Sequence, residues 1–379
     1  MPALQPRLAT GAEGHAFGLD LARFLAIALV LVTHCSMMFL GIAGQTPPAV
    51  VLMASFFGVE LFFVLSGFLI GGLLFRLAET DPTPRGWLIF MARRWMRTLP
   101  LYLVWLVVLV LVLPGPADRA GMLLRYAAML QNFAWPMPPA HWFNESWSLT
   151  VEEWFYSLFS IALLGSAAIA RSDKVAWPVL AAFIVVPPVL RAFAPAHGDF
   201  DDQIYHVALF RLDAIAWGAA LARLHRQGSA LFAHPRLCGT IGAVLVAIVW
   251  SQGSNSTWLP MPWTTFLHAR LLAASIGLSL LLVALLPLHT PRGALRAVVR
   301  GGARISYGIY IMHLTIIATV AWQAAQHGLG LGVVVPVSLA LIVLLPALSW
   351  RFFEAPILAH RPRQSPARAA WPARGLRRT

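Results

Sequence analysis

Residues 56–70 read FFGVELFFVLSGFLI, an apolar stretch in which Glu60 is the single charged side chain. The stretch lies within a longer apolar run over about 49–75, and about 20 apolar residues in a helix suffice to cross a hydrocarbon core. Similar runs recur along the whole chain, and they predict an all-α, polytopic membrane bundle of about ten transmembrane helices. The predicted spans are about 17–40, 49–75, 97–114, 149–170, 175–193, 204–222, 237–252, 268–288, 304–324 and 330–353.

The composition supports a membrane protein along nearly its whole length. The chain has 379 residues, of which 59% are hydrophobic and 11% are charged. Soluble domains carry about 25% charged residues. We therefore expect one membrane domain over residues 17–356, preceded by a short segment (1–16) and followed by a disordered basic tail (357–379).

The arginines predict the orientation of the chain. Its net charge is +13, and the basic residues concentrate in alternate short connections and in the tail. That distribution follows the positive-inside rule, so both termini are expected in the cytoplasm and the bundle in the inner (cytoplasmic) membrane. The basic tail could rest on anionic membrane lipid, although a role as a topology anchor is the simpler interpretation. The same distribution argues against nucleic-acid binding.

The first span carries two ionisable residues within apolar sequence. It reads GLDLARFLAIALVLVTHCS over residues 18–36, so Arg23 and His34 are eleven residues apart. That separation is about 20° from three full turns and about 16.5 Å along the axis, which places both on one helix face at two depths. Ionisable residues inside a membrane mark function by default. Arg23 could instead pair with Asp20, and His34 could be a neutral histidine bonded to a neighbouring helix.

Three arginines, Arg93, Arg94 and Arg97, lie just before the third predicted span. Guanidinium groups match the geometry of phosphate oxygens, so the cluster predicts a phosphate clamp. The alternative is that these arginines only fix the topology.

Carboxylates lie near the outer part of two spans. Glu60 is either a site residue or the partner of a buried base. Glu152 and Glu153 open the fourth span, where acidic residues also favour the N-terminal helix dipole. Since adjacent helix residues point apart, at most one of the two is expected to face His34.

The remaining candidates lie in later spans. Arg211 and Asp213 are two residues apart, point in different directions, and each need a partner on another helix. His313 lies in the middle of the ninth span. No histidine or cysteine pattern has zinc-site spacing, so no metal is predicted. We expect the outer residues to converge around a water-accessible cavity with the arginine cluster at its inner mouth.

Six segments in order resemble acyltransferase family 3, the bacterial membrane O-acyltransferases, over about 18–356. They are the Arg23/His34 pair, Phe56–Ile70, the Arg93, Arg94 and Arg97 cluster, Trp147–Tyr156, Ser306–His313 and Glu354–Pro356. Glu60 stands where many members carry aspartate, and Trp154 replaces the usual glutamine. The resemblance implies an acyl-CoA donor, hydroxyls of glycans or lipid-linked sugars as acceptors, and essential roles for His34 and Arg23.

The hypothesis is an O-acyltransferase that moves an acyl group, expected to be acetyl, from cytoplasmic acyl-CoA to an extracytoplasmic or lipid-linked glycan. His34 acts as general base, Glu152 orients its imidazole, and Arg23 guides the pantetheine arm. An acyl-histidine relay, and Glu153 in place of Glu152, are left open. The predicted CoA-binding residues are Arg23, Arg93, Arg94 and Arg97, and the predicted substrate-binding residues are Glu60, Glu153, Arg211, Asp213 and His313.

The competing hypothesis is a secondary transporter or flippase of a glycan or small anionic solute. Transporters are often built from inverted repeats with broken helices, and the sequence shows neither clearly. Consumption of the thioester would distinguish the enzyme from the transporter.

Overall fold

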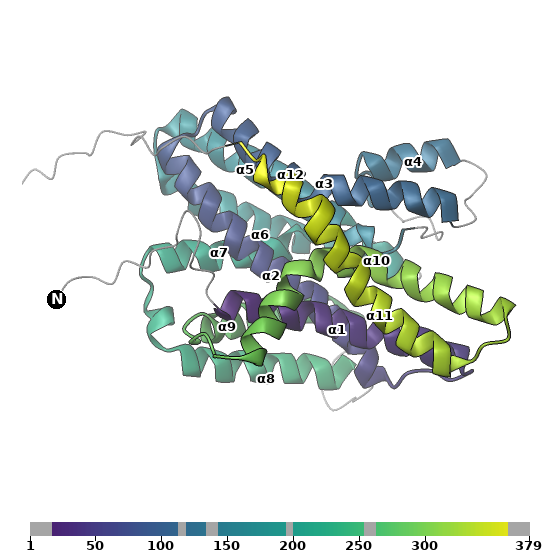
Figure 1. The fold of residues 1–379 in the computed structure, drawn as a ribbon. Coiled ribbons are helices and arrows are strands. Elements are labelled where there is room, and N and C mark those ends of the chain that lie inside the picture. The colour runs from purple at the N-terminus through teal and green to yellow at the C-terminus, as the bar shows by residue number, and fades with distance from the viewer. Residues whose placement is uncertain (1–16, 113–118, 134–142, 195–199, 254–262, 363–379) are drawn as a thin grey trace, which may run out of the picture.

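The computed structural model describes residues 17–112, 119–133, 143–194, 200–253 and 263–362. Every regular element in these ranges is helical, with short 3₁₀ or π turns between several helices (Figure 1). The α-helices are α1 (Phe17–Ile42), α2 (Ala49–Thr80), α3 (Pro84–Val112), α4 (Arg119–Ala127), α5 (Ser146–Ala170), α6 (Ala176–Phe193), α7 (Leu212–Arg226), α8 (Pro235–Gly253), α9 (Trp263–Leu285), α10 (Ala294–Gln326), α11 (Leu331–Ser349) and α12 (Ala355–Ala359).

Nine helical segments of the described chain are long and apolar enough to cross a membrane. They confirm the predicted all-α polytopic bundle. The sixth predicted span, 204–222, is not one continuous helix. A π turn (Asp201–Tyr205) and a 3₁₀ turn (Ala208–Phe210) precede α7, which has only 15 residues. Almost all of α7 is buried, and irregular backbone is tolerated at membrane depth where protein surrounds it.

Two helices begin well before the apolar runs that predict them. α3 starts at Pro84 rather than near 97, and α10 starts at Ala294 rather than near 304. Hydropathy locates only the apolar part of a span, whereas the helix continues into the arginine-rich connection. The arginines in these extensions therefore lie on regular helix faces.

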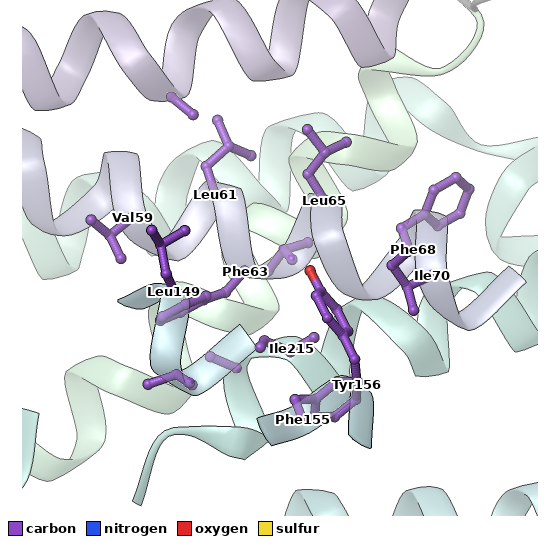
Figure 2. Packing of buried hydrophobic residues seen from close by; sticks show 14 of the residues in the cluster. Val59, Leu61, Phe63, Leu65, Phe68, Ile70, Leu149, Phe155, Tyr156 and Ile215 are labelled. Atoms are coloured by element: carbon purple, nitrogen blue, oxygen red, sulfur yellow. The ribbon is translucent and has the colours of Figure 1, made fainter. Parts of the chain in front are cut away.

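Helix α2 lies at the centre of the bundle and packs against α1, α5, α7 and α9. Its contact with α7 is very close, because a Cβ atom at Gly67 would overlap the Ile215 carbonyl and one at Gly218 would overlap the Val64 carbonyl. Small residues at such positions let helix backbones approach. Figure 2 shows apolar side chains of α2 between α5 and α7, with the Tyr156 hydroxyl pointing toward α2.

Helices α11 and α12 form one nearly continuous rod, drawn in yellow across the bundle (Figure 1). A π turn (Trp350–Glu354) joins them, and such turns are frequent at functional sites. The predicted tail begins at 357, but α12 extends to Ala359 and residues 360–362 still lie in the described chain. The rest of the tail and the segment 1–16 lie outside the described residues.

Candidate active site

A cavity of about 650 Å³ lies among α1, α2, α3, α5 and α10, beside the π turn that precedes α12. Along α10 its lining runs from Arg300 to Tyr310, about 15 Å of helix axis. We call one end the arginine end and the other, where Ser148 and Tyr310 lie, the hydroxyl end. The lining arginines are Arg23, Arg94, Arg97, Arg300, Arg304 and Arg361.

Two of the arginines in the cavity are held in place by aromatic rings and carboxylates. Arg97 donates to Glu354 at 3.3 Å, and its guanidinium lies 5.5 Å from the Tyr307 ring and 5.2 Å from the Trp350 ring. Arg94 lies over the Tyr156 ring at 4.4 Å. Cation–π contact and ion pairing position these charges without fully neutralising the cavity.

Arg23 forms the ion pair with Asp20 that is one of the sequence alternatives, and it also lines the cavity as the other alternative requires. It pairs with Asp20 one turn earlier at 3.8 Å, and Asp20 is also 3.8 Å from Arg300. Arg23 nevertheless lines the cavity with its side chain 27% exposed, so one carboxylate is shared by two arginines that both face the cavity. Arg23 can therefore contact an anionic ligand.

Arg93 is separate from its two neighbours. It does not line the cavity, and its Nη1 atom donates to the Pro362 carbonyl at 2.6 Å. The predicted clamp of three arginines on α3 is thus reduced to Arg94 and Arg97. Arg93 instead fixes the segment that follows α12.

His34 is paired with another histidine rather than with a carboxylate. Its Nδ1 atom lies 2.7 Å from Nε2 of His313, and the two nearly parallel rings have centroids 5.0 Å apart. Nδ1 of His313 lies 3.0 Å from the Ile309 carbonyl and 2.9 Å from the Tyr310 carbonyl. Carbonyl oxygens only accept, so Nδ1 of His313 carries the proton and its Nε2 accepts from Nδ1–H of His34. This network leaves Nε2 of His34 as an unprotonated base.

The carboxylate expected to orient His34 is engaged elsewhere. Glu152 lines the cavity and accepts a hydrogen bond from the Tyr156 hydroxyl at 2.8 Å, and Tyr156 also bonds Ser66. Glu153 accepts from Thr98 at 2.7 Å and is not on the cavity wall. His313 takes the place that the sequence assigns to Glu152. Nothing in the spacing of residues within one helix could indicate this contact between α1 and α10.

The hydroxyl end of the cavity stops just short of the two histidines. Tyr310 lines the cavity, shares a 2.6 Å hydrogen bond with Ser148, and has its ring centroid 6.2 Å from that of His313. His34 is half-buried and is not on the cavity wall. The Tyr310 side chain therefore separates the cavity from the histidine pair.

Three predicted substrate-binding residues lie in a closed ion-pair cluster away from the cavity. Glu60 is bonded to Arg211 and lies 3.3 Å from Ser275 Oγ, with both charged side chains fully buried. Asp213 receives two hydrogen bonds from Arg191, at 2.9 and 2.7 Å. Arg211 and Asp213 thus have the separate partners that their spacing requires, and Glu60 is the partner of a buried base.

Sequence reasoning missed several cavity residues. Arg300 and Arg304 belong to one of the basic connections that the sequence explains by topology alone, although they share one helix face with Tyr307 and Tyr310 at spacings of four, three and three residues. Recognising that face required the long N-terminal extension of α10. Ser148 and Arg361 carried no signal of their own. Cys, His, Asp and Glu residues of the described chain form no group of three or more that could hold a metal ion.

Comparison with known proteins gives one match. The model of acyltransferase family 3, described as an acyltransferase domain, matches residues 17–351. No curated protein and no solved structure matches the chain.

Proposed function

Because this chain belongs to acyltransferase family 3 and is a multi-pass membrane acyltransferase, we propose that it transfers an acetyl group from acetyl-CoA to a hydroxyl of a glycan or lipid-linked saccharide. The observation that carries this proposal is the cavity. Six arginines line it against two carboxylates, Asp20 and Glu152, and at its hydroxyl end the Tyr310 ring centroid lies 6.2 Å from that of His313, the partner of His34. An anionic donor with a neutral reactive end suits this distribution of charge.

The donor enters from the arginine end in this proposal. That end faces the cytoplasm, where CoA thioesters are made, and the His34 end faces the opposite side of the bacterial inner membrane. The arginine-rich connections support this orientation through the positive-inside rule. Arg94, Arg97 and Arg23 contact the diphosphate, and the pantetheine arm extends along α10 toward Ser148 and Tyr310.

The transfer uses His34 as the general base. Nε2 of His34 accepts the proton of the acceptor hydroxyl while the hydroxyl oxygen attacks the thioester carbonyl carbon. The C–S bond then breaks, and the imidazolium returns the proton to the CoA thiolate. The Ser148 hydroxyl, which shares a hydrogen bond with Tyr310, becomes free to donate to the carbonyl oxygen as that atom gains negative charge, once the Tyr310 side chain has moved. The reaction requires the Tyr310 side chain to move, because it separates the cavity from the histidine pair.

His313 has the orienting role that a carboxylate has in a triad. By accepting Nδ1–H of His34, it fixes the tautomer in which Nε2 is the base. Glu152 instead accepts a hydrogen bond from Tyr156, the residue whose ring lies under Arg94, and it lines the donor cavity together with Arg94. A covalent acyl-histidine on Nε2 of His34 is the variant mechanism, and rapid quenching in the absence of acceptor distinguishes the two.

The direct test uses purified full-length protein with acetyl-CoA labelled in the acetyl group and lipid-linked saccharides extracted from bacterial envelopes. We expect acceptor-dependent release of free CoA and label recovered as a base-labile ester on the saccharide. The same preparation of His34→Ala should release none. Exchange of labelled substrate across sealed vesicles, without consumption of the thioester, would contradict the proposal and favour the transporter alternative.

A further inference from the structure

Three arginines that line the cavity have no role in the proposed contacts with the diphosphate: Arg300, Arg304 and Arg361, here called the outer arginines. The Arg300 side chain is 38% exposed, compared with 27% for Arg23 and 22% for Arg97. Arg304 is exposed, and Arg361 follows the last helix of the described chain. We call Arg94, Arg97 and Arg23, the arginines proposed to contact the diphosphate, the inner tier, and the outer arginines the outer tier.

Helix α10 gives the direction of these tiers. Arg300, Arg304, Tyr307 and Tyr310 all line the cavity from one helix face. Arg304 is about 9 Å and Arg300 about 15 Å from the level of Tyr310, at 1.5 Å of rise per residue. A ligand whose reactive end reaches Tyr310 thus has its far end beside the outer arginines.

The charge of the outer arginines is largely unmatched. Arg300 shares Asp20 with Arg23, and neither Arg304 nor Arg361 has a carboxylate within ion-pair distance among the described residues. The Nε atom of Arg361 is buried and has no hydrogen-bond partner in the described chain. Burial, followed by repulsion from Arg97, Arg93 and Arg94, lowers the pKa of Arg361 to about 10. A bound anion would relieve that repulsion.

The position of Arg361 is fixed by a long-range contact. Arg93 on α3 donates to the carbonyl of Pro362, the residue after Arg361, at 2.6 Å. This bond holds the segment that follows α12 against α3, so that Arg361 lies at the cavity. An arginine that only sets topology needs no such tether.

We propose that the outer arginines form a site for a phosphate monoester, the 3′-phosphate on the ribose of CoA. This inference rests on the proposed function, and it assigns the diphosphate to the inner tier. In CoA the ribose 3′-phosphate lies at the end of the molecule opposite the thioester, and the outer arginines line the part of the cavity away from Tyr310. A phospholipid headgroup offers the same phosphate chemistry, and the experiment separates the two sources.

The test measures equilibrium binding of CoA and of 3′-dephospho-CoA to purified full-length protein in detergent. We expect the unsubstituted protein to bind CoA about 10- to 100-fold more tightly, since hydrogen bonds between charged groups are strong. The double variant Arg304→Gln/Arg361→Gln should bind CoA only as well as 3′-dephospho-CoA, while its affinity for 3′-dephospho-CoA is unchanged. Arg351→Gln is the matched control, because Arg351 is an exposed arginine of the π turn that does not line the cavity.

Each other outcome refutes a different statement. If the double variant loses affinity for CoA and for 3′-dephospho-CoA by the same factor, or keeps its affinity for both, the 3′-phosphate site is refuted. Loss of binding to vesicles that contain phosphatidic acid, with the preference for CoA intact, assigns the outer arginines to lipid instead. If the unsubstituted protein binds neither CoA nor 3′-dephospho-CoA, the donor proposal itself fails.

Discussion

Two groups of arginines lie inside this membrane protein, and they differ in what they face. In the closed cluster, Arg211 is bonded to Glu60 and Arg191 to Asp213, with all four side chains buried and each charge matched. Around the cavity, six arginines face the lining carboxylates Asp20 and Glu152, and Arg97 is also paired with Glu354. The guanidinium groups of Arg94 and Arg97 lie against aromatic rings as well. Ion pairs between helices join those helices, whereas arginines in excess of the neighbouring carboxylates form a binding site for an anion from outside the protein.

The difference also explains why burial alone does not identify the site. Arg211 is fully buried, yet its charge is paired with that of Glu60 within the protein. Its Nε and Nη1 atoms have no hydrogen-bond partner among the described residues. Arg94 and Arg97 are only half-buried, and they line a cavity that a ligand can enter. An excess of charge over partners distinguishes a binding site from a structural ion pair.

The largest effect is expected at the histidine pair. His34→Ala removes the proposed base and should lower the transfer rate about 10²- to 10⁴-fold, the usual contribution of general base catalysis. Insertion and thermal stability should change little, because His34 is only half-buried and its partner His313 keeps both carbonyl contacts. Initial rates of CoA release, with membrane yield as the control, provide the measurement. Full activity in this variant would remove His34 from the mechanism.

The next largest effect is expected in the closed cluster, and on stability rather than chemistry. Arg211→Met leaves the Glu60 carboxylate buried without its partner, which should cost about 3–5 kcal/mol. The double variant Glu60→Leu/Arg211→Met removes both charges and should recover most of that loss. Thermal denaturation in detergent measures both. A single variant as stable as the unsubstituted protein would show that the pair does not hold α2 and α7 together.

A smaller effect on the rate is expected from His313, which positions His34. His313→Leu removes the acceptor for Nδ1–H and should lower kcat about 10- to 100-fold by releasing the tautomer of His34. His313→Gln keeps an acceptor oxygen and should retain more activity. The pH profile of kcat distinguishes this role from simple packing, since loss of packing would leave its shape unchanged. Equal losses in the two variants, with that shape unchanged, would contradict the positioning role.

The smallest effect is expected where α2 meets α7. Gly67→Ala places a methyl group against the Ile215 carbonyl and should destabilise the protein by about 1–3 kcal/mol. Gly72→Ala is the matched control, because a Cβ atom there meets nothing within 4 Å. Equal denaturation midpoints for the two variants would show that the close approach of the helices is not required.

The sequence predicts the bundle well because apolar length is a local property. It fails at α7, since hydropathy cannot show that a 3₁₀ turn interrupts the helix just before Arg211. It identifies Arg23, His34 and Glu152 as candidates from charge within apolar spans, and Arg94 and Arg97 from a cluster of arginines at the start of one. It cannot assign their partners: the contact of His34 with His313 and that of Arg93 with Pro362 join residues 279 and 269 positions apart. Only packing between helices decides such pairs.

The central claim is that the cavity, where arginines outnumber carboxylates, binds the acyl donor, whereas the ion pairs of the closed cluster only hold helices together. The most direct measurement is the thermal stabilisation that CoA gives to purified protein, which rises with ligand concentration relative to Kd. We predict a clear upward shift in the unsubstituted protein and in Glu60→Leu/Arg211→Met, and none in Arg94→Gln/Arg97→Gln at the same CoA concentration. A shift that survives in the cavity variant but disappears in the cluster variant would contradict the claim.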